Sequence, residues 1–413
     1  MPKTNVEPTV GQLPKKTWSQ YKESLVELPD LIEPQRESFK WFVESGLKEI
    51  FKEFSPIADY SEKKFELSFK KYELGEPKYS PEYAKENKRT YEAPLRATVV
   101  LKNKTFDSAK DQEIFMTDIP VMTDNGTFII NGVERVIVPQ LARSYGIFFT
   151  TNDSKGRMMF GAKIIPARGA WVEIESESDG VIYVKIDRKK KFPITSLLRV
   201  LGIEKDEDML KLLQGVERGE EYLKATLEKD PAKTTDDAYI EIYKRLRDGD
   251  LATVENAREF VDSIFAPERY DLSEIGRYHF NGRFGLPTDA KAGDVRTVTQ
   301  EDMRLILTHI ITCNHDPQAE ADDIDHLGFR RVRYFGEMLQ QRMRVGMTRM
   351  KRNIQDRMST IESETSLPIQ IVNPRPLQAA IKEFYTTNQL SQFGSQQNIL
   401  AELEHLRTLS ALG

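Results

Sequence analysis

Cysteine is almost absent from this sequence: Cys313 is the only one among 413 residues. A single cysteine excludes an internal disulfide and any zinc site built from several cysteines, and it is typical of a reducing compartment. The sequence has no apolar run of 18 residues, and residues 1–16 contain no apolar stretch of signal-peptide length. We therefore expect a cytoplasmic chain that has no membrane partner.

Common signatures of cofactor and metal sites are missing as well. No GxxxxGK[ST] or GxGxxG element occurs, so neither a phosphate-binding loop nor a dinucleotide fold is indicated. The histidines are scattered and do not pair at the four-residue spacing of helical zinc ligands; they include His279, His309, His315 and His326. We expect no metal ligand and no cofactor in this chain.

Basic residues are concentrated in one stretch of an otherwise acidic protein. The net charge is -5, yet Arg330–Arg357 contains nine Lys/Arg against two acids, Glu337 and Asp356. Phosphate contacts act over about a Debye length, so a local excess of positive charge indicates a polyanion-binding site. The alternative is a solvated helix face.

Hydrophobic spacing predicts the first half of the fold. Residues Pro34–Phe54 have apolar side chains at helical spacing, and Lys64–Val121 contains strand-like runs. Asn125-Gly126 and Asn131-Gly132 each precede an apolar run, and Asn-Gly favours tight turns between antiparallel strands. We therefore predict two successive hairpin turns within residues 123–138, with strand-like alternation continuing to Ile186.

The second half of the sequence is helical in character. Apolar spacing predicts helices over Asn256–Phe265 and Gln300–Cys313, the latter capped by Thr299, with a loop over Asn281–Gly293. Arg333–Met358 is predicted to form one long amphipathic helix with a basic outer face. At 413 residues the length predicts two or three domains, and 39% hydrophobic with 30% charged residues fits a soluble globular protein. The strand-like first half and the helical second half together predict a multidomain α+β protein with antiparallel sheets and long helices.

Several motifs resemble those of bacterial RNA polymerase β subunits, in the same order along nearly the whole chain. The motifs are LIEPQRESFKWF (31–42), DIPVMTDNGTFIINGVERVIVPQLARS (118–144), IIPARGAW (164–171), IDRKKKFP (186–193), RYDLSEIGRYHFN (269–281), DDIDHLG (322–328), NPRPLQAAIKEF (373–384), QLSQF (389–393) and LSALG (409–413). The resemblance implies an N-terminal fragment of that subunit that stops inside its fork region.

The resemblance also implies a domain layout in which one domain is inserted in another. The expected parts are a flexible arm (1–20), the first part of the protrusion (21–140), the lobe (141–321), the second part of the protrusion (322–388) and the truncated start of the fork (389–413). Two segments far apart in sequence would then share one core.

In the family resembled, a pocket for an unpaired guanine of the nontemplate DNA strand corresponds here to Arg143, Ile324, Asp325 and Arg330. A carboxylate can accept hydrogen bonds from the Watson–Crick edge of guanine, which is exposed only in single strands, and an arginine can hold phosphate or stack on the base. Phe329 stands where the family usually has a small polar residue, so the pocket is expected to differ in shape.

Two short basic clusters are a second set of candidates. Lys155 and Arg157 lie in a turn-like segment, and Arg188 begins a run of four basic residues. Surface solubility explains such clusters by default. The resemblance implies that they belong to the lobe and face downstream duplex DNA, where they would contact phosphates without reading sequence.

The family also has a pocket beside the path of nascent RNA, where rifamycin antibiotics bind. The matching residues are Arg135, Val138, Gln392, Phe393, His405 and Ser410. Val138 and Phe393 could instead be core residues. The usual methionine, aspartate, proline, threonine, lysine and arginine are replaced by Gly394, Ser395, Ile399, Glu404, Leu406 and Thr408. Lost polar partners predict weak rifamycin binding.

The resemblance implies the N-terminal part of the β subunit of a DNA-dependent RNA polymerase, forming a wall of the DNA cleft. The partners would be the β′, α and sigma subunits, both DNA strands and nascent RNA. Catalytic Mg²⁺ would be bound by β′, so no catalytic residue is expected in this chain. One alternative is a free-standing nucleic-acid-binding or scaffold protein, and another is a metal-dependent nuclease using the acids of 322–325.

Overall fold

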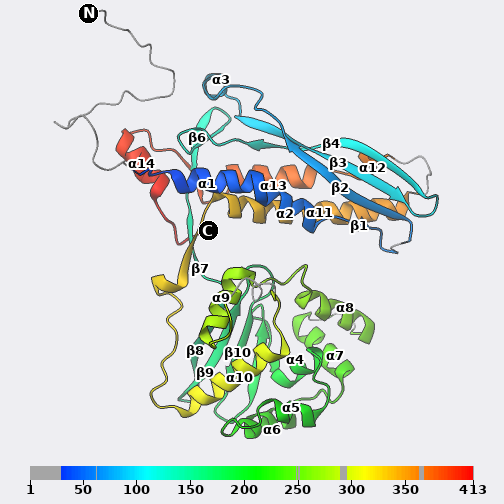
Figure 1. The fold of residues 1–413 in the computed structure, drawn as a ribbon, viewed down its shortest axis with the longest axis vertical. Coiled ribbons are helices and arrows are strands. Elements are labelled where there is room, and N and C mark those ends of the chain that lie inside the picture. The colour runs from blue at the N-terminus through cyan, green and yellow to red at the C-terminus, as the bar shows by residue number, and fades with distance from the viewer. Residues whose placement is uncertain are drawn as a thin grey trace, which may run out of the picture.

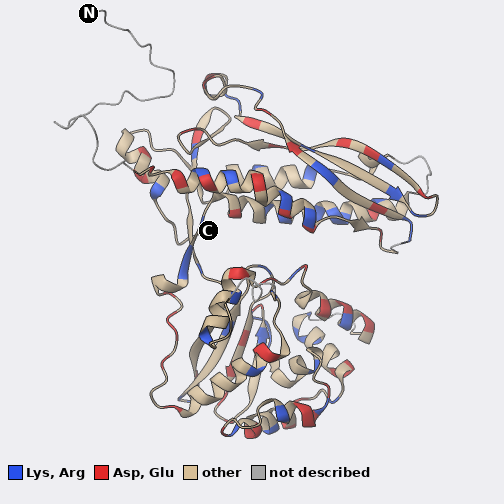
Figure 2. Ribbon diagram, viewed as in Figure 1, with Lys and Arg blue, Asp and Glu red and all other residues tan. Residues whose placement is uncertain are grey.

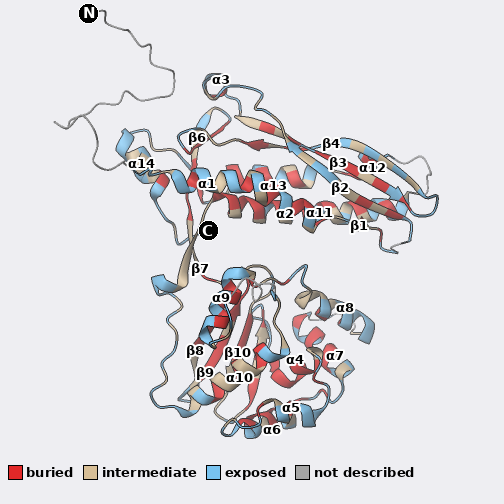
Figure 3. Cartoon of the chain, in the orientation of Figure 1, coloured by how far each residue is buried: buried red, intermediate tan, exposed pale blue. Residues whose placement is uncertain are grey.

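The computed structural model describes residues 29–61, 63–247, 249, 252–288, 295–361 and 367–412. These residues form two bodies, each with its own hydrophobic core (Figure 1, Figure 3). The fold is α+β with antiparallel sheets and long helices, which confirms the predicted fold class. The predicted flexible arm, residues 1–20, lies outside the described residues.

The first body is built on a four-stranded antiparallel sheet in the order β1-β2-β3-β4. Its strands are β1 (Ile57–Ala58), β2 (Phe65–Leu74), β3 (Glu92–Asn103) and β4 (Ser108–Pro120). The helices of this body are α1 (Glu33–Trp41), a π-helical turn (Phe42–Gly46), α2 (Leu47–Glu53), α3 (Pro81–Glu86), α11 (Phe335–Thr360), α12 (Pro368–Ile371) and α13 (Arg375–Thr386). The predicted amphipathic helix at 34–54 is confirmed, and the π-helical turn interrupts it.

Helix α11 forms the spine of the first body and confirms the predicted long helix. Phe335, Leu339, Met343, Met350 and Ile354 are buried, as expected for one side of an amphipathic helix. The expected basic outer face needs a correction, because part of that face is covered by α2. The guanidinium of Arg344 is half-buried and forms an ion pair with Glu53 at the end of α2.

The two predicted hairpin turns are present at the left end of the first body in Figure 1. The first is closed by the N–H of Thr123, which donates to the carbonyl of Thr127 (2.8 Å). β5 (Phe128–Ile130) and β6 (Val133–Ile137) are joined by Asn131 and Gly132, which have φ of 51° and 80°. This turn needs glycine, because a Cβ on Gly132 would lie 2.7 Å from Cα of Lys88. β14 (Ser391–Phe393) pairs with β6 and completes a small sheet, and α14 (Ile399–Arg407) follows it.

The second body contains a five-stranded antiparallel sheet in the order β12-β11-β10-β9-β8. Its strands are β8 (Gly146–Ser154), β9 (Arg157–Ile165), β10 (Val172–Ser176), β11 (Ile182–Ile186) and β12 (Phe192–Pro193). The helices packed around it are α4 (Ile194–Val200), α5 (Asp206–Leu212), α6 (Gly219–Lys229), α7 (Thr235–Leu246), α8 (Val254–Phe265), α9 (Ser273–Arg283) and α10 (Gln300–His315). Within the described ranges, no helix is long and apolar enough to cross a bilayer.

Helix ends in the second body test two local predictions. Thr299 caps α10, and its side chain and that of Asp302 form a capping box with the backbone, as the sequence predicts. The loop predicted from Asn281 begins too early, because α9 continues to Arg283. Residues 289–294 of that loop lie outside the described residues.

A two-stranded ribbon joins the two bodies (Figure 1). β7 (Gln140–Arg143) leads into the second body, and β13 (Arg330–Arg333), which follows a short 3₁₀ turn (Leu327–Phe329), leads out of it. The strands pair antiparallel, with Arg330 opposite Arg143. The first core combines residues from 42–137 with residues from 335–390. The exact boundaries given above for protrusion, lobe and fork stay a prediction.

Candidate nucleic-acid interface

The ribbon between the bodies brings together residues predicted to bind an unpaired base. The backbone N–H of Ser144 donates to the carbonyl of Phe329 (2.8 Å), which extends the pairing of β7 with β13. Beside this pairing, Nη2 of Arg143 lies 3.2 Å from Oδ1 of Asp325. The Asp325 side chain is 66% exposed. A carboxylate in this position is held by an arginine and is still open to a ligand.

The other residues of the predicted pocket are more enclosed. Arg330 donates from Nη2 to the carbonyl of Leu141 (2.9 Å), so its guanidinium braces the ribbon. Ile324 is half-buried. The ring of Phe329 packs edge-on against Phe148, with centroids 5.6 Å apart. Phe329 is therefore anchored to the second body and forms an aromatic wall where a small polar residue was expected.

The acids of 322–325 each have a different partner. Asp322 accepts a hydrogen bond from the backbone of Phe149 (2.8 Å) and pairs with Arg283 (2.9 Å). Asp323 accepts from the backbone N–H of Asp325 (3.0 Å). In the part of the chain that the structure describes, no group of three or more His, Cys, Asp or Glu could hold a metal ion. This arrangement gives the nuclease alternative no support.

Three of the nine cations of the basic run 330–357 form ion pairs with described residues. Arg331 and Arg333 both pair with Glu337, and Arg344 pairs with Glu53. Four other cations, Arg342, Arg349, Arg352 and Arg357, are exposed on α11 and form no ion pair with any described residue, although Arg357 donates to the carbonyl of Gln370 (2.9 Å). Figure 2 shows basic residues along α11 and α2. Only part of the charge seen in the sequence is therefore available to a polyanion.

The pair of Arg331 and Glu337 is extended by Tyr145. The Tyr145 hydroxyl donates to Oε1 of Glu337 (2.8 Å), and the Arg331 guanidinium lies over the Tyr145 ring, 4.2 Å from its centroid. Burial, followed by the charge of Glu337, raises the pKa of Tyr145 to about 12. Burial acts to raise the pKa of Glu337, but hydrogen bonding to Arg331 and its charge outweigh it and the pKa is lowered. Sequence reasoning noticed Glu337 only as one of two acids in a basic run.

The residues predicted to lie beside the RNA path are also brought together. β14 places Gln392 opposite Val136 and Phe393 opposite Arg135 on β6. Nε2 of His405, on α14, lies 3.0 Å from Oε1 of Gln392. The backbone N–H of Ser410 donates to the carbonyl of Pro139 (3.0 Å). Partial burial lowers the pKa of His405, which favours the neutral ring.

The core alternative holds for Val138 and is wrong for Phe393. Val138 is 1% exposed and packs with Val136 and Leu406. Phe393 is 64% exposed, and the Arg135 guanidinium lies 4.5 Å from its ring centroid. Arg135 also donates to the carbonyl of Ser391 (3.3 Å). An exposed ring held by an arginine offers a stacking surface to a base or another planar group.

The two basic clusters of the second body are not brought together. Lys155 and Arg157 are exposed at the turn between β8 and β9, whereas Arg188 lies in the turn between β11 and β12. Because the five strands alternate in direction, these turns fall at opposite ends of the sheet. Arg188 lies over the ring of Trp171, 5.1 Å from its centroid. The clusters can act only as two separate contacts.

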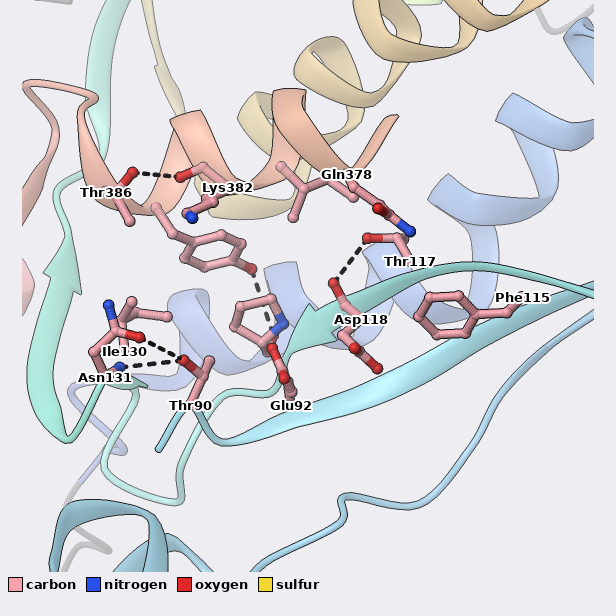
Figure 4. Close-up of a pocket in the computed structure, with 13 residues that line it drawn as sticks. Thr90, Glu92, Phe115, Thr117, Asp118, Ile130, Asn131, Gln378, Lys382 and Thr386 are labelled. Atoms are coloured by element: carbon pink, nitrogen blue, oxygen red, sulfur yellow. Dashed lines mark hydrogen bonds between the residues drawn. The ribbon is translucent and has the colours of Figure 1, made fainter. Parts of the chain in front are cut away.

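A pocket of about 350 Å³ lies elsewhere, between β4, α13 and the β5–β6 turn (Figure 4). Its lining includes Glu92 and Asp118 on the sheet and Lys382 and Tyr385 on α13. Burial, then the charge of Asp118, raises the pKa of Glu92. None of the residues predicted to bind nucleic acid lines this pocket.

Residues 143–333, which run from the end of β7 to the end of β13, match the family model of RNA polymerase Rpb2, domain 2. This match indicates that the second body is similar to a domain of RNA polymerase subunits of the Rpb2 class. The chain is also similar to DNA-directed RNA polymerase subunit beta of three bacteria. It is 44% identical to that of Syntrophomonas wolfei subsp. wolfei (98% of this chain, 36% of the relative), 45% to that of Synechococcus elongatus (94% and 35%) and 40% to that of Geobacillus thermodenitrificans (94% and 39%).

The chain belongs to the family of bacterial DNA-directed RNA polymerase β subunits and corresponds to the N-terminal part of that subunit. This confirms the resemblance inferred from the sequence motifs. The chain spans between 35% and 39% of the length of these three relatives.

Proposed function

We propose that this chain forms one wall of the DNA cleft of a multisubunit RNA polymerase and captures an unpaired guanine of the nontemplate strand. The observation that carries the proposal is the placement of Asp325 beside Arg143. Its exposed carboxylate is fixed by a 3.2 Å ion pair and can accept the two N–H groups of a guanine Watson–Crick edge. Arg330 would support this pocket by bracing the ribbon, and the half-buried Ile324 would form part of its wall.

Other surfaces of the chain would contribute phosphate and RNA contacts. Arg342 and Arg349 are exposed and have no ion pair within the described residues, so they are free to meet a phosphate backbone. Phe393 with Arg135 and Gln392 would line the RNA path, and Lys155, Arg157 and Arg188 would contact downstream duplex at two separate places. The β′, α and sigma subunits would complete the enzyme, and β′ would hold the Mg²⁺ ions that support nucleotidyl transfer.

The test is discrimination between bases at one unpaired position. A polymerase assembled with the complete subunit is titrated with forked DNA that carries guanine or adenine at one nontemplate position, and binding is followed by fluorescence anisotropy. We expect guanine to be preferred about tenfold or more, because a good pair of hydrogen bonds is worth roughly 1–3 kcal/mol of discrimination. Asp325→Ala removes the preference. Glu320→Ala, which removes an exposed acid five residues earlier in the chain, leaves the preference unchanged.

Equal binding of the two DNAs by the unmodified enzyme would overturn the proposal for this pocket. The free-standing alternative predicts salt-sensitive DNA binding by the chain alone and no co-purification with β′, α and sigma. The nuclease alternative predicts Mg²⁺-dependent DNA cleavage that Asp325→Asn abolishes. The separate partners of Asp322, Asp323 and Asp325 give no reason to expect such cleavage.

A further inference from the structure

Two motifs that identified the family have no part in the nucleic-acid contacts described above. One is IIPARGAW, which ends β9 and leads to β10, and the other is RYDLSEIGRYHFN, which contains most of α9. The structure joins them through a short antiparallel bridge between Arg168 and Asp271. The backbone N–H of Arg168 donates to the carbonyl of Asp271 (3.0 Å), and the N–H of Asp271 donates back to Arg168 (2.8 Å).

This bridge holds Arg168 firmly to the second body. Gly169 has φ of 114°, and a Cβ at that position would lie 2.8 Å from Cδ2 of Tyr270, so glycine lets the two segments approach closely. The guanidinium of Arg168 is oriented further by Asp271, at 3.8 Å from Oδ2. The backbone of Arg168 is thus fixed before its side chain leaves the second body.

The side chain of Arg168 crosses to the first body and meets Glu53. Nη1 of Arg168 lies 2.7 Å from Oε2 of Glu53, and Nε of Arg344 on α11 lies 2.8 Å from the same oxygen. The three side chains are only 28%, 19% and 24% exposed for Arg168, Glu53 and Arg344. An ion pair that is this shielded from water is weakened less by salt than a surface pair and is costly to break on one side.

A second contact between the bodies lies in the lining of the same pocket as Arg168. Tyr145, at the start of the second body, hydrogen-bonds to Glu337 of α11. The pocket, of about 550 Å³, is lined from both bodies, with Trp41 on the first and Ile275 on the second. Its charged lining includes both arginines and carboxylates, so it does not favour a ligand of one charge. The space leaves room for the bodies to change their angle.

We propose that the ion pair of Arg168 with Glu53 is a clasp that sets the angle between the two bodies, and that opening it lets the second body swing about the β7·β13 ribbon. The chain crosses between the bodies through that ribbon, which a hinge motion can twist without breaking either core. Arg344 holds the Glu53 carboxylate in place from the first body. The clasp is a property of the fold and does not depend on the proposed base pocket, so each can fail without the other.

The experiment measures the distance between the bodies in the full chain. Spin labels are attached at Glu259→Cys on α8 and Thr348→Cys on α11, both exposed positions, with Cys313→Ser to remove the native thiol. Pulsed electron–electron double resonance then gives the distribution of distances between the two labels. We expect one narrow distribution for the parent and an added population of on the order of 10% or more in Arg168→Gln and in Glu53→Gln. The double variant gives no further broadening, because both changes open the same clasp.

Controls separate the clasp from general destabilisation. Arg304→Gln removes an arginine–glutamate pair within α10 and leaves the distance narrow. Because the ion pair is shielded from water, we expect 1 M KCl to leave the parent distribution narrow. Narrow distributions in both clasp variants would overturn the proposal, whether or not the variants lose stability.

Discussion

Tyr145 donates a hydrogen bond of 2.8 Å to Oε1 of Glu337, a residue 192 positions further along the chain. Tyr145 lies where the chain enters the second body, and Glu337 lies in the first turns of α11. Arg331 pairs with the same carboxylate and lies over the Tyr145 ring. This cluster ties the entry strand, the exit strand and the long helix together, and it makes their association sensitive to alkaline pH.

The pH dependence follows from the raised pKa of Tyr145, about 12 against the ordinary value of 10.0. Below pH 10 the phenol is protonated in both folded and unfolded chains, so its contribution is constant. Above pH 10 the unfolded chain releases the proton more readily, and stability is lost as the pH rises towards 12. Two pKa units correspond to about 2–3 kcal/mol. Urea unfolding at pH 8–12 should show a smaller alkaline loss in Tyr145→Phe.

The matched control for this prediction is Tyr278→Phe, which removes a hydroxyl that is on the second body and largely exposed. At pH 8 Tyr145→Phe should also cost roughly 1.5–3 kcal/mol, the usual worth of a hydrogen bond to a charged group. Identical alkaline profiles for Tyr145→Phe and the parent would show that the phenol is not coupled to folding.

Because α11 packs closely on α13, we expect one added methyl group at Gly346 to destabilise the protein strongly. A Cβ on Gly346 would lie 2.9 Å from Cα of Leu377, a backbone atom that cannot move aside cheaply. Gly346→Ala should therefore lower the free energy of unfolding by about 1–3 kcal/mol through overpacking. Gly282→Ala on α9 is the control, since nothing lies within 4 Å of its Cβ. That change should be neutral or stabilising by up to about 1 kcal/mol. Equal denaturation midpoints for the two variants would contradict the close approach.

The free cations of α11 predict a change in the salt dependence of DNA binding. Removing Arg342 and Arg349 together should reduce the slope of log K against log salt by about 1.4–1.8, since each phosphate contact contributes about 0.7–0.9. The comparison is Lys211→Ala, an exposed cation on α5 of the second body. The measurement uses the assembled polymerase and bubble DNA at several salt concentrations. An unchanged slope in the double variant would show that this face of α11 does not touch nucleic acid.

The six departures at the predicted rifamycin pocket lead us to expect weak inhibition by rifamycins of a polymerase that carries this segment. Ser395 and Thr408 replace a carboxylate and a guanidinium, and the Thr408 hydroxyl donates to the carbonyl of Glu404 (2.9 Å). Ser395→Asp with Thr408→Arg should tighten inhibition about tenfold or more, because hydrogen bonds to charged groups contribute about 1.5–3 kcal/mol. Ser395→Asn, which has the shape of aspartate without its charge, should not. Tight inhibition of the unmodified enzyme would show that the six departures do not weaken rifamycin binding.

Local features of this fold could be predicted from sequence because their causes are local. The Asn131-Gly132 turn, the capping box of Thr299 and the long helix from Phe335 all depend on residues within a few positions of one another. Helix α9 escaped prediction because its buried residues include Arg277 and Asn281, which give no apolar periodicity. Such a helix is specified by tertiary partners, here the buried pair of Arg277 and Asp302.

The sequence predicted which residues of the candidate site lie close together, but it did not predict how much of the nearby charge is neutralised. Family motifs pointed to Arg143 and Asp325, and the ribbon places them side by side. The sequence could not show which cations of 330–357 are free, since the acid that pairs with Arg344 lies 291 residues earlier. Charge counted along a chain overestimates the charge offered to a ligand wherever distant acids fold back onto it.

The β7·β13 ribbon has a consequence for how such a subunit can be altered. The chain leaves the first body at Arg143 and returns at Arg330, and these residues face each other across a paired register. The segment between them, the second body, is therefore an insertion whose two ends lie next to each other. The inserted segment could be replaced by that of a homologue, or shortened to a tight turn. The core of the first body, which is built from residues outside the insertion, would keep its own strands and helices.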